Sequence, residues 1–293
     1  MGMKQVLITG SDGQLGSSLL ELQNDFYGLE LIPSDIADLD ITRQDQVKDY
    51  LSSRSIDYVV NCAAFTAVDK AEQFETDAFA INQLGSKNLA ETCESLKIPL
   101  VHISTDYVFS GESHLPYRED DLPGPLTAYG RSKLGGENSV LDSGVYGLII
   151  RISWLYSEFG SNFVKSMLRL GSERKELGVV FDQVGSPTYA GDLALAILSI
   201  LNGFSEGNIV LEKTKIYNYC NQGVCSWYDL AQAVMDIGEL DCKIHPITTE
   251  EFPLPAKRPH YSVLNTSLFR NKFNLAIPHW RDSLSLCIEN LKT

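Results

Sequence analysis

Long apolar runs are missing from this 293-residue sequence. No stretch approaches the ~20 consecutive apolar residues that a membrane-spanning helix needs. The start of the chain also lacks the apolar core of a secretory signal, because the run Val6–Ile8 gives way at once to Thr9 and Gly10. We therefore expect a cytoplasmic protein that does not engage the membrane.

Paired cysteines and clustered metal ligands are missing as well. The six cysteines, at positions 62, 93, 220, 225, 242 and 287, form no C-x-x-C pair, and no Cys/His cluster has zinc spacing. Free thiols in a reducing compartment are the simplest interpretation. We expect no metal centre.

Positive charge is scarce, since 24 Lys and Arg face 38 Asp and Glu for a formal net charge of -14. An acidic surface repels phosphate backbones, which argues against nucleic acid as a partner. A substrate that carries phosphates would need a local pocket of Lys, Arg and backbone N–H groups.

Short apolar runs alternate with longer stretches of helical pattern up to about residue 153. The runs are Gln5–Thr9, Leu29–Pro33, Tyr58–Ala63, Leu100–Ser104 and Leu148–Ile152, and the helical stretches are 14–24, 43–54, 74–97 and 128–142. This β-α-β rhythm predicts a parallel sheet covered by helices on both faces, an α/β fold of the doubly wound Rossmann type.

The rhythm loosens in the second half. Helical patterns cover 159–171, 190–202, 226–238 and 281–291, strands are predicted at Gly178–Phe181 and Ile216–Cys220, and the Pro-rich segment Phe252–Pro259 is predicted to be a loop. We predict a first domain over 1–153 and a smaller, interleaved region over 154–293. The strands near 178–181 and 216–220 are expected to join the first domain.

Glycines at 10, 13 and 16 follow the first strand directly and precede a helix. Such a loop lets the backbone approach a pyrophosphate, and the helix N-terminus then points N–H groups at it, so the first domain is predicted to bind a dinucleotide. The spacing is G-x-x-G-x-x-G rather than the commoner G-x-G-x-x-G.

Two further segments carry open alternatives. Asp35 ends the second strand, where an acid bonds the adenosine ribose and favours NADH over NADPH, or else caps the turn. Asp40 and Ile41 either contact adenine or simply precede a helix N-cap at Thr42.

Tyr129 and Lys133 are spaced to lie on one face of a helix, and Thr105 lies at the end of the fourth strand, where ligands bind in open parallel sheets. Reduction of a ketone leaves an alkoxide that needs a proton, which Tyr129 can donate. A nearby Lys133 ammonium should lower the tyrosine pKa towards neutrality and can hold the nicotinamide ribose, while the Thr105 hydroxyl polarises the carbonyl.

Together these residues resemble the extended short-chain dehydrogenase/reductase superfamily and, within it, the dTDP-4-dehydrorhamnose reductases. The resemblance covers nearly the whole chain. It rests on Gly13–Gly16, Asn61–Glu72, Ser104–Phe109, Tyr129–Lys133, Arg151–Trp154, Asn162-Phe163, Asp182–Thr188 and Arg258–His260. It implies NADPH- or NADH-dependent reduction of the 4-keto group of dTDP-4-dehydro-L-rhamnose to dTDP-L-rhamnose.

The resemblance also implies a role for each matching position. Catalysis falls to Thr105, Tyr129 and Lys133. The cofactor would be bound by Gly10, Gly13, Gln14, Leu15, Cys62, Ala63 and Ala64. Beyond what the resemblance implies, we expect contacts to the cofactor from Asp12, Asp35, Asp40, Ile41, Thr66, Ser104, Tyr129 and Lys133. The sugar nucleotide would be bound by Thr66, Val68, Thr105, Asp106, Tyr107, Trp154 and Arg258. Simpler roles compete: Thr66 and Val68 can form a turn, Asp106 can cap a helix, Tyr107 and Trp154 can fill the core, Arg258 can be a surface charge, and Asn162 can cap a helix.

Some family members dimerise through magnesium held by glutamates, but Ser18 and Gly191-Asp192 stand at the matching positions, so a magnesium site is doubtful and a homodimer stays open. Three other functions compete with the reductase. One is a non-catalytic regulatory subunit of this fold, as in methionine adenosyltransferase. Another is reduction of a different 4-keto-6-deoxy sugar nucleotide. The third is an epimerase or dehydratase, but dehydratases carry Asp-Glu after the threonine, and Thr105 precedes Asp106 and Tyr107.

Overall fold

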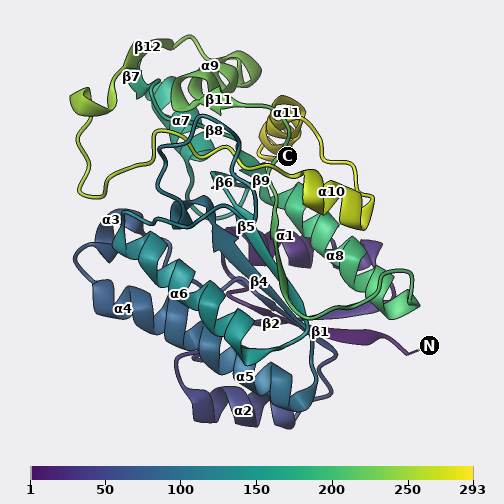
Figure 1. The fold of residues 1–293 in the computed structure, drawn as a ribbon. Coiled ribbons are helices and arrows are strands. Elements are labelled where there is room, and N and C mark those ends of the chain that lie inside the picture. The colour runs from purple at the N-terminus through teal and green to yellow at the C-terminus, as the bar shows by residue number, and fades with distance from the viewer. Residues whose placement is uncertain (1, 293) are drawn as a thin grey trace.

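The centre of the molecule is a six-stranded parallel sheet with the strand order β10-β5-β4-β3-β1-β2 (Figure 1). The computed structural model describes residues 2–292. The strands are β1 (Lys4–Thr9), β2 (Leu29–Ser34), β3 (Tyr58–Asn61), β4 (Leu100–Thr105), β5 (Gly147–Ile152) and β10 (Lys215–Asn218). Every residue of β3, β4 and β5 is buried, which explains their continuous apolar runs. The predicted Rossmann-type α/β fold is confirmed.

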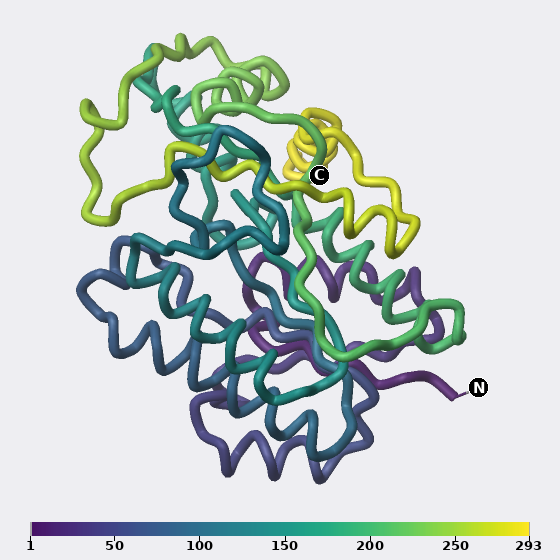
Figure 2. The backbone as a smooth tube through the Cα atoms, in the orientation of Figure 1, coloured from purple at the N-terminus to yellow at the C-terminus, as the bar shows by residue number. Residues whose placement is uncertain are grey.

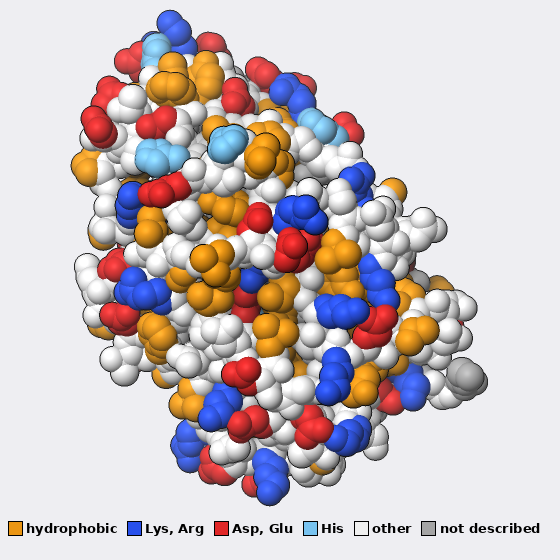
Figure 3. All heavy atoms as spheres, in the orientation of Figure 1, with side chains coloured by type: hydrophobic (Ala, Val, Ile, Leu, Met, Phe, Trp, Pro, Cys, Tyr) orange, Lys and Arg blue, Asp and Glu red, His pale blue; other side chains and the backbone are white. Residues whose placement is uncertain are grey.

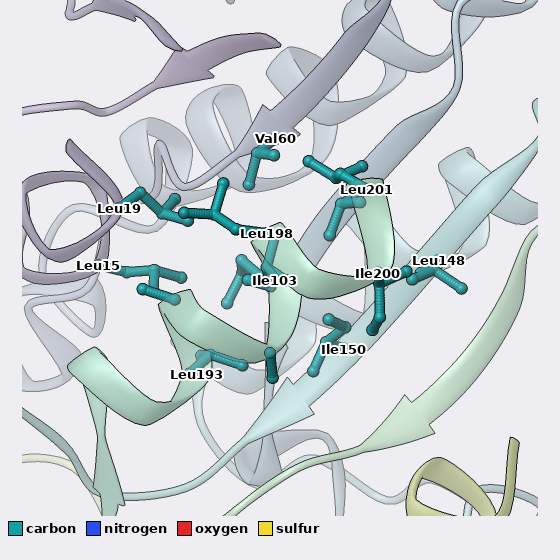
Figure 4. Packing of buried hydrophobic residues seen from close by; sticks show 14 of the residues in the cluster. Leu15, Leu19, Val60, Ile103, Leu148, Ile150, Leu193, Leu198, Ile200 and Leu201 are labelled. Carbon is teal, nitrogen blue, oxygen red and sulfur yellow. The ribbon is translucent and has the colours of Figure 1, made fainter. Parts of the chain in front are cut away.

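Helices cover both faces of this sheet. On one face lie α1 (Gln14–Glu21) and α8 (Ala190–Glu206), and on the other α2 (Gln44–Ser52), α5 (Ser86–Leu96) and α6 (Ala128–Ser143). Figure 4 shows leucines of α1 and α8 pointing at Val60, Ile103 and Ile150 of the sheet. The strand order reverses between β1 and β3, so a crevice opens there at the carboxyl ends of the strands.

The predicted helix over 74–97 is made of three parts. It begins as α4 (Glu75–Phe79), passes through a π-helical segment η2 (Ala80–Gly85), and ends as α5. A short helix α3 (Val68–Ala71) precedes it. π-helical turns are rare and are frequent at functional sites, and η2 lies beside α6.

Most of the second half, apart from α8 and β10, forms a smaller region beyond the carboxyl ends of the sheet (Figures 1 and 2). It contains α7 (Phe163–Glu173), α9 (Trp227–Gly238) and α11 (Trp280–Asn290), which share one apolar core. Three two-stranded sheets complete it: β6 (Leu155–Tyr156) with β9 (Thr188–Tyr189), β7 (Glu176–Val180) with β12 (Lys243–Ile247), and β8 (Val184–Gly185) with β11 (Cys225–Ser226). The helix α10 (Ser267–Phe273) packs near β10, and short 3-10 turns are η1 (Gln23–Asp25), η3 (Asp106–Val108) and η4 (Thr249–Glu251).

One expected strand placement is wrong. The segment near 178–181 does not join the central sheet, because β7 pairs with β12, and β10 occupies the edge beside β5. The expected strand near 216–220 is β10, and it does join the sheet. The segment 252–259 is a loop as predicted. The interleaving is visible in Figure 2, where the chain returns from the upper region to the sheet for β10 and then leaves it again.

The exterior on the side drawn in Figure 3 mixes acidic and basic side chains without a large field of one sign. Across residues 2–292, no helix combines the length and apolarity needed to cross a membrane. The same described residues contain no cluster of His, Cys, Asp and Glu able to hold a metal ion.

Candidate active site

A cavity of about 730 Å³ lies at the carboxyl ends of the central strands. Its lining brings together nearly all the predicted site residues: Gly10, Gly13, Gln14, Leu15, Asp35, Asp40, Ile41, Cys62, Ala63, Ala64, Thr66, Val68, Ser104, Thr105, Asp106, Tyr107, Tyr129, Lys133 and Trp154. Asp12 and Arg258 are not part of the lining. The predicted cofactor and substrate positions therefore share one crevice, at the point where the strand order reverses.

The glycine-rich loop forms the part of the cavity wall nearest β1. Gly10 has a φ of +66°, and a Cβ there would lie 2.7 Å from the Cα of Ala63. A Cβ on Gly16 would lie 2.5 Å from the carbonyl oxygen of Gly10. Only glycine fits these positions, and α1 begins directly after the loop with no side chain capping it. The free N–H groups at this helix start form a cradle suited to a pyrophosphate.

Gln14, the first residue of α1, reaches from this loop to the C-terminal region. Its Oε1 accepts hydrogen bonds from the Asn162 Nδ2 at 2.9 Å and the Ser157 Oγ at 3.2 Å. Asn162 also caps α7 by accepting a hydrogen bond from the Lys165 backbone N–H at 3.0 Å. The predicted capping role of Asn162 is confirmed.

The acidic residues after β2 bond to their own turns. The two carboxylate oxygens of Asp35 accept from the backbone N–H groups of Ile36 (2.8 Å) and Asp12 (3.1 Å), although Asp35 also lines the cavity. Asp40 accepts from the Thr42 N–H and hydroxyl. The alternative that Thr42 caps α2 is wrong, because the N-cap is Arg43 and no side chain caps that helix.

The predicted catalytic residues come from two elements whose ends meet in the cavity. Tyr129 lies in the first turn of α6, which Thr127 caps by accepting from the Gly130 N–H at 3.0 Å. Thr105 ends β4, where its hydroxyl donates to Asp106 Oδ1 at 2.9 Å and accepts from the Tyr107 N–H at 3.2 Å. The alternative that Asp106 caps a helix is wrong, because the N-cap of η3 is Thr105 and Asp106 is the first residue of that turn.

Burial controls the protonation of this site. It raises the Tyr129 pKa to about 12, although a hydrogen bond with Thr105 opposes this shift. Burial lowers the Lys133 pKa to about 8, although the negative charge of Glu137 opposes this shift. The Lys133 Nζ donates to the backbone oxygen of Ile103 at 2.6 Å. The expected lowering of the tyrosine pKa is therefore wrong for this structure, because burial outweighs the stabilisation of the phenolate.

Asp106 is a buried carboxyl beside the phenol. Burial raises its pKa to about 7, although hydrogen bonds from Thr105 and Ser262 oppose the shift. The ring of Tyr107 packs edge-on against Tyr129 with 5.5 Å between centroids. Two titratable groups with very different pKa values, an acid near neutrality and a phenol far above it, thus face the same space.

An aromatic pair forms another part of the cavity wall. Trp154 lies 3.6 Å from Trp227, centroid to centroid, with 9° between the ring planes. Both line the cavity. Trp154 has a φ of +50°, a strained conformation for a bulky residue that is typical of ligand sites. Trp227 escaped the sequence prediction, because a residue in the first turn of a predicted helix gives no sign of facing a cleft.

Arg258 lies at the edge of this site. Its Nη2 forms an ion pair with Asp69 Oδ2 at 2.5 Å, and the Ala256 N–H donates to Asp69 Oδ1 at 3.1 Å. The loop that carries Arg258 is thereby attached to α3. Asn82 of η2 holds a neighbouring loop. Its side chain accepts from the Phe65 N–H and donates to the Phe65 carbonyl and to the Ser132 hydroxyl. It fixes the loop that carries Thr66 and gave no sequence signal.

Comparison with known proteins agrees with this geometry. The sequence model of the family described as RmlD substrate binding domain matches residues 3–293. A dTDP-4-dehydrorhamnose reductase of Aggregatibacter actinomycetemcomitans is 38% identical over 96% of this chain and 97% of its own. A crystal structure of a dTDP-4-dehydrorhamnose reductase from Clostridium acetobutylicum aligns with a TM-score of 0.92 and 42% identity, covering 99% of this chain and 100% of that one.

A second solved structure carries a cofactor. The dTDP-4-dehydrorhamnose reductase of Bacillus anthracis, in complex with NADP, aligns with a TM-score of 0.91 and 37% identity over 98% of this chain and 99% of that one. A UDP-glucose 4-epimerase of Brucella ovis, only 16% identical, shares the fold. The chain therefore belongs to the RmlD substrate binding domain family, together with the dTDP-4-dehydrorhamnose reductases that it matches over nearly its whole length.

Proposed function

We propose that this protein reduces the 4-keto group of dTDP-4-dehydro-L-rhamnose to dTDP-L-rhamnose with NADPH or NADH. The observation that carries the proposal is the meeting of Thr105, Tyr129 and Lys133 in one cavity with the glycine loop. Full-length similarity to reductases of this substrate supports it, and so does the NADP complex of a relative.

The cofactor fits the residues that are present. The bare N-terminus of α1 and the close approach of Gly10 to Ala63 leave backbone where a pyrophosphate needs it, and Asp35 lies at the ribose end of the predicted site. When bound, the reduced nicotinamide supplies a hydride to the carbonyl carbon. Lys133, from inside the same cavity, can hold the nicotinamide ribose hydroxyls.

The protein's own part of the reaction is proton delivery. A phenol with a raised pKa stays protonated at neutral pH, so Tyr129 can donate its proton to the alkoxide oxygen as the reaction requires. We expect the Thr105 hydroxyl to bond the same oxygen and the charged Lys133 to stabilise the phenolate that remains. Val68, Trp154 and the loop at Thr66 would hold the sugar, with Asp106 and Tyr107 beside the reacting carbon. A contact of Arg258 with the substrate phosphates stays a prediction.

A different 4-keto-6-deoxy sugar nucleotide is the second candidate substrate. A relative from Streptomyces niveus, 35% identical over 95% of this chain, is a dTDP-4-keto-6-deoxy-D-glucose reductase. The non-catalytic alternative has less support, because the three candidate catalytic side chains are present and close together. Epimerase relatives share the fold at low identity.

The test is turnover by the purified protein with both reduced cofactors on enzymatically made dTDP-4-dehydrorhamnose, followed by loss of the reduced cofactor's absorbance. We expect Tyr129→Phe to lower kcat by about 10²–10⁴-fold, whereas Tyr146→Phe, a half-exposed tyrosine outside the cavity lining, keeps full activity. A fully active Tyr129→Phe would disprove the mechanism. No turnover of dTDP-4-dehydrorhamnose by the unaltered chain with either cofactor would disprove the function.

A further inference from the structure

A buried ion pair lies directly behind the candidate catalytic lysine. Glu137 follows Lys133 by one turn of α6, and its side chain has no exposed surface. Its two carboxylate oxygens accept from the Arg151 Nη2 at 2.7 Å, the Arg151 Nε at 2.8 Å and the Ser104 hydroxyl at 2.6 Å. The pair is therefore bidentate and buried, and both carboxylate oxygens of Glu137 accept hydrogen bonds.

The pair connects three elements that carry the site. Ser104 precedes Thr105 on β4, Arg151 belongs to β5, and Glu137 lies on the helix that carries Tyr129 and Lys133. Arg151 also donates to the backbone oxygen of Glu119 and lies over the ring of Phe109. These contacts fix the height and the rotation of α6 relative to the end of β4.

Stability alone does not account for such a pair. Two buried charges lose so much hydration that a well-packed apolar pair of similar volume is often equally stable or more stable. Arg151 interrupts a buried strand that is otherwise apolar apart from Gly147. A role in the neighbouring chemistry explains why charge is placed here.

Three titratable groups interact electrostatically with Lys133: Cys62, His102 and Glu137. Burial raises the pKa of Cys62 to about 12, so the thiol is neutral. Burial lowers the pKa of His102 well below its usual value, so the imidazole is neutral, and its Nδ1 is bonded to the Asn61 side chain. Within residues 2–292, Glu137 is then the one anion among the groups that act on the Lys133 ammonium.

We propose that Glu137, held by Arg151 and Ser104, is a positioning residue for the reduction, which keeps the Lys133 amine charged and level with Tyr129 and Thr105. The inference rests on the proposed function, because it assigns Glu137 a task only if Lys133 acts in turnover. Glu137 is not itself part of the cavity lining, although it bonds Ser104, which is. It would therefore act on the reaction through Lys133.

The test compares Glu137→Gln with the unaltered enzyme by the pH profile of kcat/KM and by the pH dependence of the NADPH dissociation constant. Loss of the anion disfavours the charged amine, so the alkaline decline of activity should begin at a pH lower by roughly one unit or more. NADPH binding should weaken at the same lower pH. Glu137→Asp, which keeps the charge, should restore the position of the decline in part.

Two further variants separate this role from folding. The double variant Glu137→Leu/Arg151→Met replaces the pair by apolar side chains and is expected to fold. It should show a shift in the same direction but smaller, because the Arg151 cation is removed together with the anion. The matched control removes the exposed pair of α6 with Glu75, in Glu75→Gln/Arg131→Met, and should leave the profile unchanged.

The outcomes are distinct. A folded Glu137→Gln or double variant with the unaltered pH profile would overturn the proposal, and so would unfolding of both, since the pair would then serve stability alone. Lys133→Met is assayed in parallel. If that variant keeps full activity, the proposed catalytic role of Lys133 fails; if it is inactive while the Glu137→Gln profile is unshifted, only the role of Glu137 fails.

Discussion

Replacing Lys133 by methionine should stabilise the free protein while it abolishes activity. Burial lowers the lysine pKa from 10.5 to about 8, and each pH unit corresponds to 1.36 kcal/mol of preference between the two protonation states. Keeping the amine charged in the folded state at about pH 7 therefore costs roughly 3 kcal/mol. Methionine has a similar length and carries no charge, and its net gain is reduced by the lost hydrogen bond to Ile103, worth about 1.5–3 kcal/mol.

The pH dependence isolates the charge from that hydrogen bond. Between the folded value near 8 and the unfolded value of 10.5, the unfolded chain binds more protons than the folded one, so the stability of the lysine protein rises with pH. The full cost is present below about pH 8 and fades as the pH approaches 10.5. The advantage of Lys133→Met should accordingly shrink by roughly 2–3 kcal/mol from about pH 7 to about pH 10.

Urea unfolding followed by far-ultraviolet circular dichroism measures this difference, with Lys48→Met on the exposed side of α2 as the control. The control should show no change of this kind with pH. If the stability gain of Lys133→Met is constant or grows between about pH 7 and about pH 10, burial of the charged lysine does not destabilise the folded protein, and the reasoning is refuted.

Two other substitutions test the cavity walls. Gly10→Ala should weaken NADPH binding at least about 10-fold, because its Cβ would meet Ala63. The control Gly144→Ala has a similar positive φ but open space around it, so it should cost only about 1–2 kcal/mol of stability and leave NADPH affinity unchanged. Equal NADPH affinities of the two variants in a fluorescence titration would contradict a role of the glycine-rich loop in binding the pyrophosphate. Trp227→Ala should raise KM for the sugar nucleotide about 3–10-fold at a nearly unchanged kcat; an unchanged KM in steady-state assays would remove the aromatic wall from substrate binding.

Local patterns in the sequence were enough to predict most of the central sheet and to select residues that line one cavity. The runs at Tyr58 and Leu148 are apolar because those strands are covered on both faces, and the glycines at 10 and 16 are dictated by a backbone contact that recurs wherever this loop occurs. A tyrosine four residues before a lysine shares a helix face with it in any sequence. These signals are short in range, so they do not depend on knowing the partner segments.

What escaped prediction depends on distant partners. The run at 178–181 has the same composition whichever sheet it enters, and only the position of β10 decides that it pairs with β12 instead. Trp227 faces the cavity because β11 and β8 pair across a long loop. Glu137 did leave a trace, since Arg151 is a charge within a buried strand and demands an anion, but the identity of that anion lies fourteen positions earlier in the chain.

The side-chain amide of Gln14 connects the glycine-rich loop to the C-terminal region. Gln14 is the first residue of α1, directly after the glycine-rich loop, and its side chain also accepts hydrogen bonds from Ser157 and Asn162 of the C-terminal region. A shift of the glycine-rich loop on ligand binding should therefore reach Ser157 and Asn162 through this one amide group. If NADPH binding then changes the affinity for the sugar nucleotide by some factor, the sugar nucleotide must change the affinity for NADPH by the same factor.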